Sequence, residues 1–123
     1  MEIKRLLTNV CSNDLEKSKL FYTSLFSFDV DFDSDWFVHL ISKGRELELG
    51  IILENHETVP LKAQGSSSGI FLTFVVDNVE TMFQTAQKLN CEIIQPPEIT
   101  SYGQKRMLLL APEGTTCDIS SPI

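Results

Sequence analysis

The chain has 123 residues, 42% of them hydrophobic, so it can bury one sizeable core but is too short for two ordinary domains. A formal net charge of −7 argues against nucleic acid and anionic membrane surfaces as partners, and a neutral or cationic small ligand fits better. The sequence shows neither an apolar leader nor an apolar run of 18 residues, so we expect a cytoplasmic, non-membrane protein. Because no CxxC pair is present, Cys11, Cys91 and Cys117 are expected to be small buried thiols.

The first half of the chain predicts a strand, a helix and three further strands. The strand spans Arg5 to Cys11 and is followed by a capping box, in which Asn13 caps the helix and Glu16 reaches back. Further strands are predicted at 28–32, 36–41 and 47–53, between polar turns. The helix between the first strand and the strand at 28–32 carries one buried face at helical spacing, made of Leu15, Ser18, Phe21, Tyr22 and Leu25.

The second half repeats this order about 64 residues later. A strand over 70–76 leads into a second capping box, Asp77 to Glu80, and strands are predicted at 92–95, 104–110 and 115–120, the first of them stopping at Pro96. The predicted fold is therefore α+β, with two βαβββ modules over about 1–54 and 70–123 and a polar linker over 55–69. A helix outside each sheet leaves the opposite faces free to form a pocket. The second helix should bury Val79, Met82, Phe83, Ala86 and Leu89.

Two motifs carry a family resemblance. The run Asn13-Asp14-Leu15-Glu16-Lys17-Ser18 with Phe21-Tyr22, and the later Ala111-Pro112-Glu113-Gly114-Thr115, sit in the repeated βαβββ order. Together they resemble the vicinal oxygen chelate superfamily of glyoxalase I, bleomycin-resistance proteins, fosfomycin-resistance enzymes and extradiol dioxygenases. The resemblance covers nearly the whole chain. It implies a homodimer with a ligand cup between βαβββ modules, which in many members come from two chains.

The enzymes of this superfamily hold a divalent metal at four positions, and the resemblance implies where these fall here. The two that are usually histidine are Leu7 and Phe71; the third, usually glutamate, falls near Glu48 with the register open by two residues, and the fourth is Asp118. Leucine and phenylalanine have no lone pair for a cation, and two carboxylates alone bind metal weakly. We therefore expect no metal and no other cofactor.

Strand alternation places Leu7 with Arg5 and Asn9 on one face, and Phe71 with Thr73 and Val75 on another, where they line the cup or plug the core. Trp36, with Phe32, Phe37 and Tyr102, would form a stacking surface for a planar or cationic ligand, or pack in the core or a dimer. The candidate ligand-binding residues are Leu7, Asn9, Trp36, Phe37, Glu48, Phe71, Thr73, Tyr102 and Asp118.

The remaining polar candidates have weaker support from the sequence. His39 is a candidate acid or base without an evident partner, and His56 is expected to be solvated. Glu48 and Asp118 would bind an amine, act as a base or hold a residual metal, or they are ordinary hydrogen-bonded carboxylates. Polar contacts at the rim of the cup are assigned to Arg5, Asn9, Gln104 and Arg106.

The leading hypothesis is a small dimeric protein that sequesters an organic or cationic ligand in a mostly apolar, metal-free cup. One alternative is a divalent-metal-dependent lyase, dioxygenase or thiol transferase that uses Glu48, Asp118 and His39 in a rearranged site. Another is a dimeric interaction module whose cup is filled by its own side chains. These alternatives differ in metal content and in whether any small molecule stabilises the protein.

Overall fold

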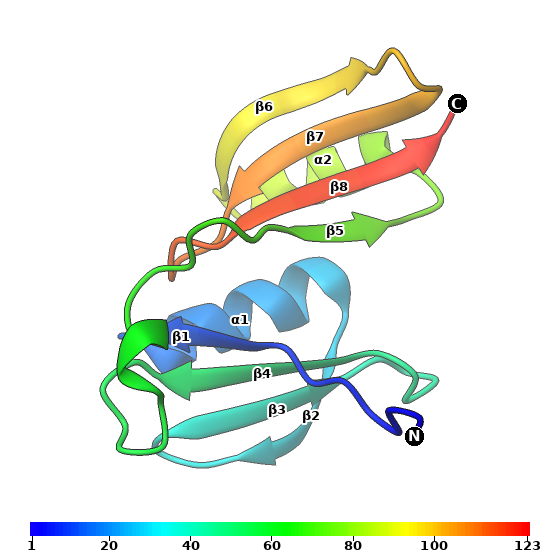
Figure 1. Ribbon diagram of the computed structural model, residues 1–123. Coiled ribbons are helices and arrows are strands. Elements are labelled where there is room, and N and C mark those ends of the chain that lie inside the picture. Colours follow the sequence, from blue (N-terminus) through cyan, green and yellow to red (C-terminus); the bar gives the residue numbers. More distant parts are fainter. The chain divides into compact units, whose positions relative to one another are not determined.

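The computed structural model describes all 123 residues, which divide into two compact units, 1–67 and 68–123. Each unit is a βαβββ module, which confirms the predicted α+β fold (Figure 1). Unit 1 contains β1 (Asn9–Ser12), α1 (Leu15–Phe26), β2 (Asp29–Asp33), β3 (Phe37–Ile41), β4 (Glu48–Leu53) and the short 3-10 helix η1 (Leu61–Ala63). Unit 2 contains β5 (Leu72–Val75), α2 (Val79–Lys88), β6 (Glu92–Ile99), β7 (Gln104–Leu110) and β8 (Thr116–Pro122).

The two sheets have the same topology. Their strand orders are β1-β4-β3-β2 and β5-β8-β7-β6. In each, the strand before the helix pairs in parallel with the last strand of the unit, and the other neighbours are antiparallel. The last strand of each unit is thereby central, so residues on it lie beside those of the first strand.

Both helices begin one residue later than the capping boxes predicted. Asp14 caps α1 by accepting from the backbone N–H of Lys17, and Asn78 caps α2 by accepting from that of Thr81. An N-cap side chain bonds the N–H two or three residues on, so Glu16 and Glu80 fall at the second helical position, too early for the predicted box. In the first turn their negative charges still interact favourably with the positive end of the helix dipole.

In each unit the helix covers one face of the sheet (Figure 1). The core of unit 1 lies between α1 and that face, and it includes Tyr22, Leu25, Val38, Leu40 and Ile51. The core of unit 2 is built in the same way from Val79, Ala86, Met107, Leu109, Cys117 and Ile119. The helix faces are narrower than predicted, since Leu15, Met82 and Phe83 are half-buried and Leu89 is exposed. Neither helix has the length and apolar composition needed to cross a bilayer.

Several boundary predictions were wrong. The first strands of the two units begin at Asn9 and Leu72, because pairing with β4 and β8 starts only there, so Leu7 and Phe71 precede them. Strand β6 continues through Pro96 and Pro97, since it is an edge strand whose register shifts at this point and the prolines need no N–H partner. Of the cysteines only Cys117 is buried, so the prediction of buried thiols was wrong for the half-buried Cys11 and Cys91, and none of the three forms a disulfide.

Candidate ligand-binding site

The face of the unit 1 sheet that α1 does not cover carries a row of rings. Strand β3 alternates, so Val38 and Leu40 enter the core while Phe37 and His39 point to the open face. Phe37 lies 6.5 Å from His39, 6.4 Å from Phe32 and 5.7 Å from Trp36 between ring centroids. We call Phe32, Trp36, Phe37, His39 and His56 the aromatic row.

The turn before β3 holds the end of this row in place. The hydroxyl of Ser34 accepts from the backbone N–H of Phe37, and the backbone N–H of Ser34 donates to the Phe37 carbonyl. The Trp36 carbonyl accepts from the N–H of Leu53 at the end of β4. The turn and the neighbouring strand end therefore both hold the backbone at Trp36 and Phe37.

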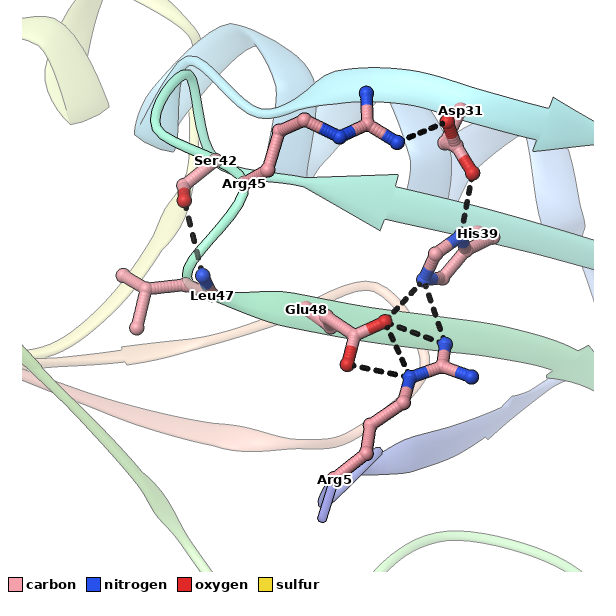
Figure 2. A network of polar contacts seen from close by, with 7 residues as sticks. All are labelled: Arg5, Asp31, His39, Ser42, Arg45, Leu47 and Glu48. Carbon is pink, nitrogen blue, oxygen red and sulfur yellow. Dashed lines mark hydrogen bonds and ion pairs between the residues drawn. The ribbon is translucent and has the colours of Figure 1, made fainter.

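Beside the aromatic row lies a network of charged side chains on the same face (Figure 2). Its centre is His39, whose Nδ1 lies 3.0 Å from Asp31 Oδ2 and whose Nε2 lies 2.8 Å from Glu48 Oε1. Arg5 donates from Nε to both Glu48 oxygens, at 2.9 and 2.8 Å. Arg45 donates from Nη2 to Asp31 Oδ1 at 3.1 Å. We call these five residues the ion network.

The ion network gives His39 two acidic partners, which the sequence did not reveal. Its ring nitrogens both face carboxylates, and Nε2 also lies 3.4 Å from Arg5 Nη2, so both nitrogens have partners within the protein. Neither nitrogen is left to contact a ligand directly. His39 therefore joins strands β2, β3 and β4, and its role as an acid or base stays a prediction.

Asp31 and Arg45 are site residues that the sequence reasoning missed. A register shift in β2 between Val30 and Phe32 brings Asp31 to the His39 side. Arg45 lies in the turn between β3 and β4 with a positive φ of 61°, and its N–H donates to the Ser42 carbonyl. A bulge of this kind has little sequence signal, and although Gly44 marks the turn, it does not show that the Arg45 side chain meets Asp31.

The network shifts the pKa of its carboxyl groups. The Arg5 guanidinium and then His39 lower the pKa of Glu48 from 4.5 to about 2, and His39 and then Arg45 lower that of Asp31. A depressed pKa means that the ionised carboxylate stabilises the folded state above pH 4.5, and this contribution is lost as the pH falls towards 2.

We expect the stability difference between the wild type and Glu48→Gln to be largest above pH 5 and to shrink as the pH falls from about 4.5 towards 2. Urea unfolding midpoints at pH 6, 4, 3 and 2 measure this difference. Glu46→Gln is the matched control, because Glu46 is an exposed carboxylate in the adjacent turn and is not a member of the ion network. A Glu48→Gln difference that is constant with pH would contradict the role of the ion network.

On the open face of the unit 2 sheet, Asp118 is only 6% exposed and both of its oxygens have partners. The Thr73 hydroxyl donates to Oδ2 at 2.9 Å, and Arg106 Nε donates to Oδ1 at 3.0 Å. The structure thus places Arg106, expected at the rim of a cup, against a buried carboxylate. Tyr102 is exposed in the turn before β7, and Gln104 lies at the start of that strand.

Internal repetition resolves the register left open near Glu48. The N-caps Asp14 and Asn78 are 64 residues apart, which makes Thr73 the counterpart of Asn9. Asn9 pairs with Gly50 across β1 and β4, as Thr73 pairs with Asp118 across β5 and β8. The counterpart of Asp118 in unit 1 is therefore Gly50, two residues beyond Glu48.

Gly50 is also a place of close approach. A Cβ atom there would collide with Asn9 Oδ1 and lie 3.0 Å from Phe37 Cε1. The missing side chain leaves room for Asn9 to lie across β4, next to the aromatic row. The residue at this position is thus used for packing, and it offers no atom to a metal.

The four positions that hold the metal in the superfamily's enzymes do not fit a metal in this chain. Leu7, Phe71 and Gly50 supply no donor atom, and the oxygens of Asp118 already accept from Arg106 and Thr73. No group of three or more His, Cys, Asp or Glu side chains is arranged to hold a metal ion. We therefore derive no chemistry through a metal.

Of the sequence-predicted candidates, the structure brings Asn9, Trp36 and Phe37 together on the open face of unit 1, with Glu48 in the ion network on the same face. It brings Thr73 and Asp118 together in unit 2. Leu7 is half-buried, whereas Phe71 and Tyr102 are exposed. His56, expected to be solvated, is half-buried and stacks on Trp36 with ring centroids 3.8 Å apart.

The doubled βαβββ topology defines the fold class, and comparison with known families agrees with it. A model of the glyoxalase-like domain matches residues 6–123. The chain belongs to this family, which confirms the resemblance found in the sequence. Among curated proteins none matches the chain significantly.

Solved structures show the same fold. A glyoxalase/bleomycin resistance protein/dioxygenase family enzyme from Burkholderia phytofirmans PsJN is 23% identical with a TM-score of 0.80, over 95% of this chain and 97% of that one. A glyoxalase-related enzyme from Fulvimarina pelagi is 17% identical with a TM-score of 0.78, over 97% and 88%. Lactoylglutathione lyase from Agrobacterium tumefaciens is 13% identical with a TM-score of 0.74, over 95% and 92%.

Proposed function

We propose that this protein is a metal-independent small-molecule-binding member of the glyoxalase-like family, which takes an organic ligand with a planar ring on the open face of unit 1. The proposal depends on the residues at the four metal positions. Three of them have no donor atom, and the oxygens of Asp118 accept hydrogen bonds from Arg106 and Thr73. In unit 1, Gly50 instead lies against the Asn9 amide and the Phe37 ring, and Phe37 in turn contacts Trp36.

The aromatic row supports a planar ligand. Rings offer a large apolar area and a π-face that attracts flat or cationic groups. The adjoining ion network supplies polar atoms at one end of this surface, since the exposed Arg5 guanidinium is directed by Glu48. Sites of this kind combine an apolar lining with a few fixed polar groups, which orient the ligand.

We further propose that the protein acts as a homodimer in the cytoplasm. Three cysteines without a disulfide fit a reducing compartment. The exposed apolar side chains of Phe71, just before β5, and Val75, at its end, are 56% and 73% exposed and fit a surface that another chain covers. The family resemblance supports the same assembly.

A thermal-shift screen of planar organic compounds, run in EDTA, tests the proposed function. We expect at least one planar compound to raise the melting temperature without added metal, because a ligand at 100 times its Kd stabilises the native state by about 2.7 kcal/mol. Trp36→Leu should remove most of this shift. Elemental analysis of protein purified without chelators should find far less than one tightly bound divalent ion per chain.

Two outcomes would contradict the proposal. About one tightly bound ion per chain, or ligand shifts that appear only after divalent metal is added, would favour the metal-dependent enzyme. A broad screen in which no compound shifts the melting temperature would favour the interaction module, whose stability depends on its own side chains alone.

A further inference from the structure

The rings of Trp36 and His56 stack face to face. The centroids are 3.8 Å apart and the rings are within 9° of parallel. Trp36 directly precedes β3, whereas His56 lies in the turn that follows β4. The imidazole thus covers one face of the indole much as a flat ligand ring would.

The backbone of this turn is held independently of the His56 ring. The His56 N–H donates to the Leu53 carbonyl, and the His56 carbonyl accepts from the N–H of Val59, whose side chain is buried. The ring itself is held only by the stack and by Thr58, whose N–H lies 3.3 Å and whose hydroxyl lies 2.9 Å from Nδ1. Rotation about the side-chain bonds alone can therefore uncover Trp36, with no change in the turn.

We propose that His56 is an internal occupant of the stacking surface on Trp36, and that a planar nitrogen-containing cation displaces it when it binds. The proposal rests on the proposed function and names its ligand class. The size and planarity of the His56 ring indicate the size and shape of a ligand group that fits against Trp36 in its place. The ring of Phe37 also lies 5.7 Å from the indole between centroids, so a ligand in the place of His56 extends the aromatic row.

The charge around the stack favours a cation. Asp35 precedes Trp36, and Glu54 and Glu57 flank His56 in the sequence. The indole face attracts positive charge, and the chain carries a net charge of −7. The acidic residues, the indole face and the net charge each stabilise a bound planar cation. A neutral ring of the same size is stabilised only by the stacking that His56 already provides.

The N-methylnicotinamide cation is a suitable probe, because it is flat and quenches tryptophan fluorescence on contact, and Trp36 is the only tryptophan. We expect His56→Ala to bind this probe about three- to tenfold more tightly than the wild type, since the competing stack is gone. His56→Phe should bind no more tightly than the wild type, because its ring still occupies the indole face. Asn55→Ala, in the same turn, is the matched control and should leave the affinity unchanged.

All titrations are run in EDTA and followed by fluorescence, with calorimetry for Trp36→Leu, which should show no binding. Equal affinities in the wild type and His56→Ala, or no quenching in either, would overturn the inference. Failure of the proposed function is seen separately, as bound metal or as a screen without a stabilising compound. A screened ligand whose stabilisation is lost in Trp36→Leu but unchanged in His56→Ala would leave the proposed function standing and overturn this inference alone.

Discussion

Asp118→Ala is expected to lower the free energy of unfolding by about 2 kcal/mol, because it leaves two donors without their acceptor. The carboxylate is 6% exposed and accepts from Arg106 Nε and the Thr73 hydroxyl. Hydrogen bonds to a charged group contribute roughly 1.5 to 3 kcal/mol, and the Arg106 side chain, at 28% exposure, recovers part of its hydration when the carboxylate is removed. Urea unfolding followed by circular dichroism measures the loss.

The same substitution separates a structural carboxylate from a metal ligand. The loss should be equal in EDTA and in added divalent metal, and Asp118→Ala combined with Arg106→Leu should cost less than the sum of the single changes. Glu92→Ala, an exposed carboxylate of unit 2, is the control and should change stability by less than about 0.5 kcal/mol. A loss that appears only in the presence of metal would show that Asp118 is a ligand after all.

Tyr22→Ala is expected to destabilise unit 1 by about 3 to 5 kcal/mol, because it removes a large buried ring and leaves a cavity. The side chain is fully buried on α1, and its ring centroid lies 4.9 Å from that of Phe21 and 6.1 Å from that of Phe26. Thermal and urea unfolding measure the effect. A loss this large is a substantial part of the stability of a small domain.

Two other substitutions in α1 serve as controls for Tyr22→Ala. Tyr22→Phe keeps the ring and should cost only about 1 kcal/mol, for the contact that the hydroxyl makes. Leu20→Ala, at an exposed position of α1, should change stability by less than about 0.5 kcal/mol. A small loss for Tyr22→Ala would mean that α1 does not cover the sheet as described.

Much of the fold follows from local patterns in the sequence. The repeated order of strands and helices is visible because apolar residues recur with period 2 or 3.6 and turns are marked by Gly, Pro, Asn and Asp. Both helices were located within one residue at their N-termini. The boundaries of the first strands were not, because Asn9 and Leu72 become strand ends only through pairing with β4 and β8. An isolated run such as Arg5 to Cys11 has no means of showing where a partner strand starts.

The candidate site was predicted less completely. Trp36 and Phe37 were predicted to form a stacking surface or to pack in the core or a dimer, since adjacent aromatics at the start of a strand are visible in the sequence. The partners of His39 and His56 were missed, because they come from residues whose contact depends on register and turn geometry. Asp31 reaches His39 through a shift in β2, and Trp36 meets His56 across the ends of β3 and β4.

The sequence by itself determined the doubled βαβββ plan and the absence of imidazole at Leu7 and Phe71, because these depend only on residue type and spacing. Only the tertiary structure decided that Gly50 is the counterpart of Asp118 and that Arg106 neutralises that carboxylate. Register across a sheet is set by the packing of whole strands, and a shift of one residue moves every side chain to the other face. A local pattern cannot contain that information.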